Sequence, residues 1–336
     1  RDRCGSQDGD QVAHGISGML VFSRAASIDE SCVRRARRYT CSMQYLIDAS
    51  VYVFRAYYSI PDDMLDADGN PVNALYGFCR FLGDFLEQVQ PRHVAIACDE
   101  SQMTSFRNEI YPDYKANREP APEELQRQFA QCRRYVRALG ISEYGHKRYE
   151  ADDFIGTLVD RGRQSGLPST IVSRDKDLAQ LLARDDVFWD FAGKGKIPYD
   201  RVPEVFGVWP EQIADFLALA GDSVDNIPGV PGVGKKTATA LLEFFGTLEA
   251  IYANLDRVHE VPVRGAKTLG ARLETHRDAA ELARQLTGIA LDAPVDDKPL
   301  SPVGPRLGEI NALFDEVDFG MALRRQAERI ADLYGA

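Results

Sequence analysis

Acidic residues recur directly after short apolar runs along this 336-residue chain. The runs that lead to Asp48, Asp99 and Asp175 have the length and composition of buried strands. In an open parallel sheet the carboxyl ends of such strands converge on one crevice. We therefore expect acids more than 170 residues apart to share a single site. The full set is Asp48, Asp99, Glu150, Asp152, Asp153, Asp175, Asp177, Asp222 and Asp225.

Clustered carboxylates repel one another unless a positive charge binds among them. Mg2+ suits such a cluster because it takes few protein carboxylates and keeps room for waters and a substrate phosphate. Glu150 and Asp153 are three residues apart and share a helix face, whereas Asp152 is expected to point elsewhere. A single Asp after a strand is more often a turn or helix-cap residue, so the prediction rests on the whole series.

Strand and helix patterns alternate from residue 43 onward. Buried strands are expected at 45–48, 93–98 and 169–173, and helical spacing at 73–89 and 123–139. This order predicts an α/β fold with a mostly parallel central sheet flanked by helices.

A polar segment at residues 100–122 interrupts this alternation. The net charge of the chain is -11, but residues 107–137 carry seven basic and five acidic side chains, so a local phosphate-binding patch is compatible with the composition. The segment mixes Tyr111 and Tyr114 with Lys115 and Arg118, which suits stacking on single-stranded nucleic acid and neutralising it. The alternative is a mobile, solvated loop.

Residues 221–238 are rich in glycine and hold two adjacent lysines. Gly229, Gly234 and Lys235 have the spacing of an NTPase phosphate loop, but Lys236 stands where Ser or Thr should bind Mg2+, and helical spacing rather than a strand precedes the segment. We interpret it as a helix, a tight hairpin and a second helix, whose N–H groups approach a DNA phosphate. A plain helix connection is the alternative. The expected DNA contacts are Gly232, Gly234, Lys235, Lys236 and Thr237.

Residues 1–42 differ from the remainder and show no sustained periodicity, so we expect an unstructured extension upstream of a natural start at Met43. A transit peptide is disfavoured by its acids. The six cysteines form no C-x-x-C pair, which argues against a zinc site or disulfide framework and favours a reducing, cytoplasmic setting. No apolar run reaches the roughly 18 residues of a membrane-spanning helix, so no membrane partner is expected.

Taken together, the motifs resemble the bacterial 5'-3' exonuclease and flap endonuclease family, which includes the N-terminal nuclease domain of DNA polymerase I. The similarity runs from about Tyr45 to Leu333. The matching stretches are Leu46-Ile47-Asp48, Arg55-Ala56-Tyr57, Ala74-Leu75-Tyr76-Gly77, Phe106-Arg107, Tyr114-Lys115, Glu150-Ala151-Asp152-Asp153, Asp175-Lys176-Asp177 and residues 221–230.

The resemblance implies a domain plan. Residues 43–200 would form a PIN-like or resolvase-like nuclease core with an arch at 100–122. Residues 201–300 would form an all-helical, helix-hairpin-helix DNA-binding region, and residues 301–336 would add C-terminal helices that pack on the core.

It also implies phosphodiester hydrolysis by two Mg2+ ions, with Mn2+ as an alternative. Lys115 and Arg118 would neutralise the scissile phosphate, Tyr52 and Phe106 would stack on bases, and Arg107 would contact DNA. The first metal group would be Asp48, Asp99, Glu150 and Asp152, and the second Asp153, Asp175, Asp177, Asp222 and Asp225.

Further implications concern partners and ions. The expected partner is DNA with a 5' flap, gap or nick, cut by a bacterial cytoplasmic monomer in replication and repair, with no evident protein partner. A K+ ion would sit in the hairpin on carbonyls near Leu219, Ala220, Pro228, Val230 and Val233.

Two alternatives stay open: a PIN-like metal-dependent ribonuclease, and a branched-DNA-binding protein with weak catalysis. One departure bears on the second. Arg174 stands before Asp175 where relatives usually have a small residue, and its charge is expected near the metals.

Overall fold

The computed structural model describes residues 43–100, 104–191, 193 and 195–335. The extension predicted at residues 1–42 lies outside the described residues. None of the helices within the described ranges is long and apolar enough to cross a lipid bilayer.

Within the described residues, six strands form one sheet in the order β3-β2-β1-β4-β5-β6. All neighbouring strands are parallel except β5 and β6, which are antiparallel. The mostly parallel sheet predicted from the sequence is therefore confirmed, although three of its short strands had not been predicted. The strands are β1 (Gln44–Asp48), β2 (His93–Ala97), β3 (Ser142–Tyr144), β4 (Ser169–Val172), β5 (Val187–Asp190) and β6 (Gly195–Pro198).

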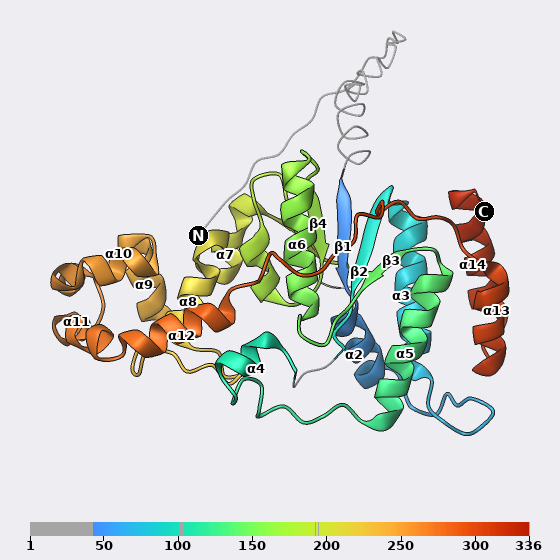
Figure 1. Ribbon diagram of the computed structural model, residues 1–336, viewed down its shortest axis with the longest axis horizontal. Helices are drawn as coiled ribbons and strands as arrows, with labels where there is room; N and C mark the ends of the chain where they lie inside the picture. Colours follow the sequence, from blue (N-terminus) through green and yellow to red (C-terminus); the bar gives the residue numbers. More distant parts are fainter. Residues whose placement is uncertain (1–42, 101–103, 192, 194, 336) are drawn as a thin grey trace, which may run out of the picture. The chain divides into compact units, whose positions relative to one another are not determined.

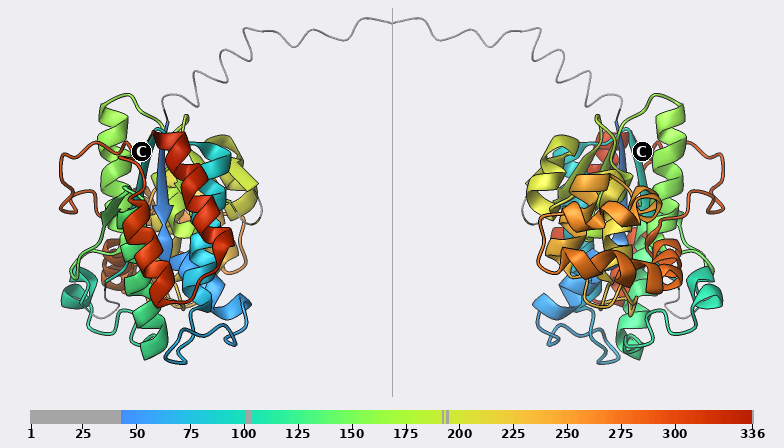
Figure 2. Two further views of the ribbon diagram at one scale, coloured as in Figure 1. Left: turned by 90° about the vertical axis from the view of Figure 1, so that its right-hand side faces the viewer. Right: turned by 90° about the vertical axis from the view of Figure 1, so that its left-hand side faces the viewer.

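Helices cover both faces of this sheet (Figures 1 and 2). Alternate residues of β1 point to opposite faces, so Tyr45 and Ile47 join one buried cluster and Leu46 joins the other. α6 (Ala151–Gln164) packs on the Leu46 face. The helices of the opposite cluster are α2 (Ala49–Ser59), α3 (Asn73–Val89), α5 (Glu123–Ala138), α13 (Leu307–Glu316) and α14 (Met321–Tyr334).

The chain changes to helices after β6, and these helices gather on one side in Figure 1. They are α7 (Val202–Phe206), α8 (Ile213–Ala220), α9 (Lys235–Phe245), α10 (Leu248–Ala253), α11 (Ala266–Thr275) and α12 (Arg277–Thr287). The 3-10 turns among the elements are η1 (Lys176–Leu181), η2 (Tyr199–Arg201), η3 (Pro210–Gln212) and η4 (Leu255–Glu260).

An extended segment, residues 288–306, then returns the chain from α12 to the core and leads into α13 and α14. We call this segment the strap. The strap follows the sheet, because the Val94 N–H donates to the Leu300 carbonyl at 2.8 Å and the Val303 N–H donates to the Gly140 carbonyl at 3.0 Å. α13 packs on α5 and α14 packs on α3. The C-terminal helices thereby complete the core on the Ile47 face of the sheet.

α8 and α9 form the helix-hairpin-helix arrangement expected for this segment. The connection is closed by a two-way backbone pair between Asp222 and Ile227, at 2.9 Å and 2.7 Å. A Cβ atom on Gly229 would lie 2.3 Å from the Gly221 backbone nitrogen, so only glycine allows the two arms to approach this closely.

We predict that Gly229→Ala destabilises the protein by about 1–3 kcal/mol, because the added methyl group meets backbone atoms that cannot rotate away. Gly234→Ala is the matched control, since a Cβ there meets nothing within 4 Å. Urea unfolding of both variants measures the difference. Equal stability of the two variants would contradict the close approach.

Candidate active site

Eight of the nine predicted acids line one cavity of about 140 Å3 at the carboxyl edge of the sheet. β1 ends at Asp48, and α6 begins next to Glu150, so strand ends and a helix start face the same space. The eight are Asp48, Asp99, Glu150, Asp152, Asp175, Asp177, Asp222 and Asp225.

Hydrogen bonds fix the acids of neighbouring strands to one another. The Ser173 hydroxyl donates to Asp48 at 2.9 Å and accepts from the Asp175 N–H at 2.9 Å. Asp175 in turn caps η1 by accepting from the Asp177 N–H at 3.0 Å. Asp99 accepts from the Ala151 N–H at 2.9 Å, which joins the end of β2 to the start of α6.

Four of the eight cavity acids, Asp48, Asp152, Asp175 and Asp177, have raised pKa values, and burial is the main cause. Burial, reinforced by Asp99 and Asp175, raises the pKa of Asp48 to about 7. Burial together with Asp175 raises the pKa of Asp177 to about 7. Burial also raises the pKa of Asp152 well above its ordinary value, and the charges of Asp175 and Asp48 add to this effect. The cavity therefore holds more negative charge than its own surroundings neutralise.

Cations from the 104–122 segment balance two of the acids. The Lys115 ammonium lies 2.8 Å from Glu150 and 3.8 Å from Asp225, and the Arg118 guanidinium pairs with Asp225. Burial disfavours the Glu150 charge, but Lys115 and Arg107 outweigh it and lower the pKa of Glu150. The described part of this segment therefore contacts the site through Lys115 and Arg118.

The backbone at Lys115 adopts a left-handed conformation, with φ of 56°. Such a conformation is uncommon for a residue other than glycine, and surrounding contacts must hold it in place. Here the Lys115 N–H donates to the Asp225 carbonyl at 3.0 Å, and the Tyr114 hydroxyl lies 3.1 Å from Glu150 and 3.2 Å from Asp225. These contacts aim the Lys115 ammonium into the cavity.

The donor set fits divalent metal ions. Two buried carboxylate oxygens, Glu150 Oε1 and Asp177 Oδ1, have no hydrogen-bond donor, and oxygens of this kind are ligands that Mg2+ accepts. Among the described residues, however, no three acidic, histidine or cysteine side chains converge closely enough to form a ready-made ligand set. The cations of Lys115 and Arg118 hold Glu150 and Asp225 instead.

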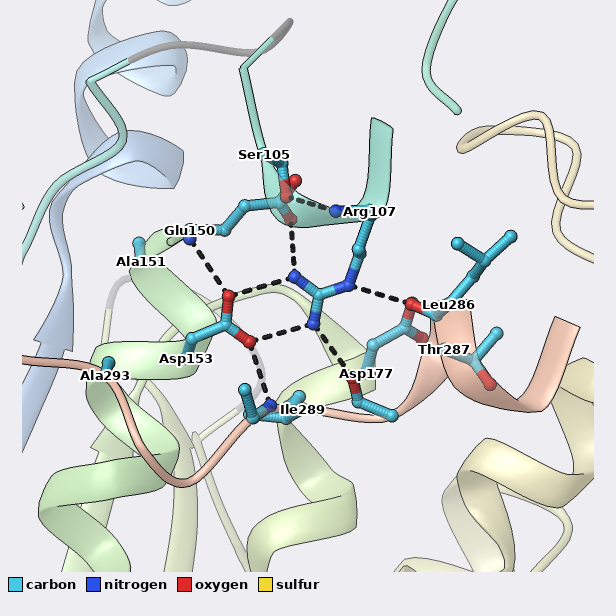
Figure 3. A network of polar contacts seen from close by, with 12 residues as sticks. Ser105, Arg107, Glu150, Ala151, Asp153, Asp177, Leu286, Thr287, Ile289 and Ala293 are labelled. Atoms are coloured by element: carbon cyan, nitrogen blue, oxygen red, sulfur yellow. Dashed lines mark hydrogen bonds and ion pairs between the residues drawn. The ribbon is translucent and has the colours of Figure 1, made fainter. Parts of the chain in front are cut away.

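Asp153 is the acid that lies away from the cavity, which corrects the expectation for the 150–153 block. Its carboxylate is fully buried beneath the site and makes a bidentate pair with Arg107, at 2.8 Å and 2.9 Å (Figure 3). Asp152, which had been expected to point elsewhere, lines the cavity. The reason is that Asp153 closes a capping box at the start of α6, with the Glu150 N–H as its donor at 3.0 Å.

Arg107 and Tyr52 are both buried. Arg107 is 3% exposed and lines the cavity, and its N–H groups are directed to Asp153 and to the carbonyls of Leu286 and Gly288. Its contact with DNA stays a prediction. Tyr52 is 2% exposed and stacks on Phe81 with ring centroids 3.7 Å apart, so it is a core residue and not a base-stacking surface.

Phe106 and Arg174 lie beside the site rather than in it. Phe106 is half-buried next to Tyr149, with ring centroids 5.8 Å apart, and its contact with DNA stays a prediction. Arg174 is exposed and reaches Asp190 at 3.4 Å, and it does not line the cavity. Its charge is therefore directed to Asp190 and not into the cavity, and its effect on the metals stays a prediction.

The predicted hairpin contacts form a separate surface at the start of α9. Gly232, Gly234, Lys235 and Lys236 are exposed, and Thr237 is half-buried. None of these residues lines the cavity. Their roles in DNA contact stay predictions.

Sequence reasoning missed Tyr114 and Ser173 as site residues. Ser173 directly follows β4, which is the position that marked the acids, so the same strand-end signal would have found it. Tyr114 precedes Lys115 within a matching stretch. The pairing of Arg107 with Asp153 had no local signal, because the two residues are 46 positions apart.

The comparisons with known proteins give two adjoining matches. Residues 43–206 match the family described as 5'-3' exonuclease, N-terminal resolvase-like domain, and residues 208–302 match the 5'-3' exonuclease, C-terminal SAM fold. The chain belongs to the 5'-3' exonuclease family. This membership identifies it as a nuclease and confirms the resemblance read from the motifs.

The relatives of this exonuclease chain include longer bacterial proteins. It is 41% identical over 278 residues to DNA polymerase I of Pseudomonas aeruginosa, covering 82% of this chain and 30% of that protein. It is 36% identical over 295 residues to DNA polymerase I of Bacillus subtilis, covering 85% of this chain and 32% of that protein. The chain thus spans about a third of the length of these curated relatives.

Solved structures share its fold. A zinc-bound T5 5'-exonuclease matches with a TM-score of 0.59 at 18% identity, covering 87% of this chain and 99% of that chain. The catalytic core of Rad2 in complex with DNA substrate matches with a TM-score of 0.58 at 13% identity, covering 87% and 93%. The nuclease core followed by a helical region is therefore a shared architecture.

The raised pKa values predict an unusual pH dependence of stability without metal. Asp48 and Asp177 have an ordinary pKa of 3.8 and a pKa of about 7 in the folded protein, so between these values the folded state binds more protons than the unfolded state. Stability is then present below this window and falls as pH rises through it. Carboxyls with lowered pKa values, such as Glu87, finish titrating below about pH 5.

We expect the melting temperature of the metal-free protein to fall between pH 5 and pH 7.5. Millimolar Mg2+ should raise it more at pH 7.5 than at pH 5, because ligand binding to the ionised site stabilises the folded state. Differential scanning fluorimetry with and without EDTA measures both effects, and Asp48→Asn should weaken the pH dependence. A Mg2+ effect that is equal at both pH values would contradict this account.

Proposed function

We propose that the chain hydrolyses DNA phosphodiester bonds near single-strand/duplex junctions, acting as a structure-specific 5'-3' exonuclease and flap endonuclease. The observation that carries this proposal is the cavity lined by eight carboxylates with Lys115 and Arg118 at its side. One cavity then combines ligands for divalent metal with cations for a phosphate. The zinc held by the T5 5'-exonuclease and the DNA substrate held by Rad2 support this reading.

Two groups of acids would hold two Mg2+ ions, with Mn2+ as an alternative. When bound, the ions supply an activated water and stabilise charge on the entering and leaving oxygens of the phosphodiester. Asp153 is left out of the second group because its carboxylate is committed to Arg107. The proposed first group is Asp48, Asp99, Glu150 and Asp152, and the second is Asp175, Asp177, Asp222 and Asp225.

Lys115 and Arg118 are proposed to neutralise the scissile phosphate. Their charges are directed to Glu150 and Asp225. A phosphodiester brought into the cavity offers the same kind of oxygen acceptor, and charge-assisted contacts to it are among the stronger hydrogen bonds. Lys115 and Arg118, which belong to the 104–122 segment, would then bind the substrate phosphate while the acids hold metal.

The hairpin between α8 and α9 is proposed to grip duplex DNA. Lys235 and Lys236 are exposed at the start of α9, where helix N–H groups and the helix dipole favour a phosphate. We retain K+ as the hairpin ion. Leu219 and Val230 already accept backbone N–H groups, but each carbonyl oxygen keeps a second lone pair for a cation. Ala220, Pro228 and Val233 would add the remaining carbonyls.

The biological setting we propose is DNA replication and repair, with a monomer acting on a 5' flap, gap or nick. The polymerase relatives support this setting, since they are DNA-synthesising proteins by name. The rates of cleavage of matched DNA and RNA flaps test whether the substrate is DNA or RNA. Faster cutting of the RNA flap would favour the ribonuclease alternative and overturn the proposal as stated.

We expect Asp152→Asn to lower cleavage of a 5'-labelled flap DNA by at least about 100-fold in Mg2+, because a proposed ligand of the ion that stabilises the transition-state charge is lost. Binding measured in EDTA should stay within about threefold, since contacts to the phosphate backbone position the DNA. Asp160→Asn, near the far end of the same helix, should cut normally. Equal loss of binding and cutting by Asp152→Asn would contradict the assignment.

We expect the double change Lys235→Ala and Lys236→Ala to weaken duplex binding independently of sequence. The slope of log affinity against log salt should fall by about 1–2, because up to two phosphate contacts no longer release counterions. Fluorescence anisotropy at several salt concentrations measures this slope. Lys298→Ala, an exposed lysine on the strap, is the control and should leave the slope unchanged. An unchanged slope in the double variant would show that the duplex does not bind at Lys235 and Lys236.

A further inference from the structure

Arg107 and Asp153 form a buried ion pair at the wall of the acidic cavity, which Arg107 lines and Asp153 does not. Asp153 is 0% exposed and Arg107 is 3% exposed. Two parallel hydrogen bonds of 2.8 Å and 2.9 Å join the guanidinium to the carboxylate. Such a bidentate pair fixes both the distance and the relative orientation of its partners.

The pair joins four separate segments of the chain (Figure 3). Arg107 lies on α4 (Phe106–Ile110), and its remaining N–H groups donate to the Leu286 carbonyl at 2.9 Å and the Gly288 carbonyl at 2.8 Å. Asp153 lies in the first turn of α6 and also accepts from the Ala290 N–H at 2.9 Å. α4, α6, the end of α12 and the strap thus meet at one point.

We propose that Arg107 and Asp153 act as a positioning pair for phosphodiester hydrolysis, and that Asp153 is not a metal ligand. The pair holds the start of α6 in a fixed relation to the segment that carries Lys115 and to the end of the helical region. This inference rests on the hydrolysis proposed above, because the residues it positions are those assigned to that reaction.

The contacts show how a disturbance at the pair reaches the cavity. Asp153 accepts from the Glu150 N–H at 3.0 Å, so it controls the backbone that carries the Glu150 carboxylate. Arg107 also lies 3.9 Å from that carboxylate. A misplacement of about 1 Å at reacting groups can cost about 100-fold in rate, so a small shift of this backbone is enough to slow the reaction.

Stability alone does not account for a buried ion pair in this place. Desolvation of two charges offsets much of their attraction, and apolar residues of similar volume often stabilise an interior as well or better. The pair instead contributes hydrogen bonds of fixed direction, which hold the contacting segments in a defined orientation. The planar guanidinium has five N–H donors in a rigid fork, and four of its contacts reach three different segments, namely α6, the end of α12 and the strap.

The test compares Asp153→Asn with wild type by three measurements. These are single-turnover cleavage of flap DNA, binding of that DNA in EDTA, and calorimetric titration with Mn2+ in the absence of DNA. Asn keeps the side-chain volume but loses the charge and one acceptor for the guanidinium. We expect the cleavage rate to fall by about 10- to 100-fold, DNA affinity to change less than threefold, and the number of Mn2+ ions bound to stay the same.

Asp186→Asn is the matched control. Asp186 is also buried, at 5% exposed, and it accepts from Arg163 at 3.0 Å and from the Ser169 and Ala183 N–H groups at 2.7 Å and 2.9 Å. It lies at the opposite edge of the sheet, where β4 begins, so it has the same chemistry away from the cavity. We expect it to lower the melting temperature but leave the cleavage rate within about twofold.

If Asp153→Asn does not fold, the same three measurements are made on Arg107→Lys. Lys keeps the charge and one contact to Asp153 but cannot reach the Leu286 and Gly288 carbonyls together with the carboxylate. We expect the same fall in cleavage rate, with Mn2+ binding unchanged. Loss of a Mn2+ ion in Asp153→Asn would make Asp153 a ligand and overturn the proposal.

Two further outcomes separate this proposal from the function on which it rests. A cleavage rate in Asp153→Asn or Arg107→Lys that falls no more than in Asp186→Asn, after matching for folded fraction, would overturn the positioning role. If wild type itself does not cleave flap DNA, the proposed function fails and the positioning role fails with it. The Mn2+ titration then still decides whether Asp153 binds metal.

Discussion

Mutual repulsion among eight buried or half-buried carboxylates is the constraint to which the surrounding structure is adapted. The cavity can keep its acids together only by raising their pKa values, by bringing in cations, or by binding metal. The structure shows the first two responses. Burial and neighbouring acids raise the pKa values of Asp48 and Asp177 to about 7, and Lys115 and Arg118 pair with Glu150 and Asp225.

In this arrangement the cations of the 104–122 segment can serve two purposes from the same position. Its cations pair with Glu150 and Asp225, and the same cations are proposed to meet the substrate phosphate. The left-handed backbone at Lys115 is held by its N–H bond to the Asp225 carbonyl and by the contacts of the neighbouring Tyr114 hydroxyl with Glu150 and Asp225. The segment and the hairpin loop are therefore joined at the cavity, and Asn226 adds a contact to the Asp113 carbonyl at 2.7 Å.

Much of the fold and of the acidic site could be predicted from local sequence patterns. The apolar runs before Asp48 and Asp175 have strand length, and parallel strands must bring their carboxyl ends to one edge. The short strands β3, β5 and β6 were not predicted, because strands of three or four residues carry little periodicity. The face assignment within Glu150–Asp153 also failed. Spacing alone does not reveal that one of these acids caps the helix from inside the core.

The sequence by itself determined the α/β order, the series of acids and the glycine hairpin, because these depend on residue type and on spacing within a few positions. The tertiary structure decided which acids face the cavity and which cations reach them. Arg107 meets Asp153 across 46 residues and Leu286 across 179 residues. Such pairings arise from the packing of separate elements, and no local pattern in the chain records them.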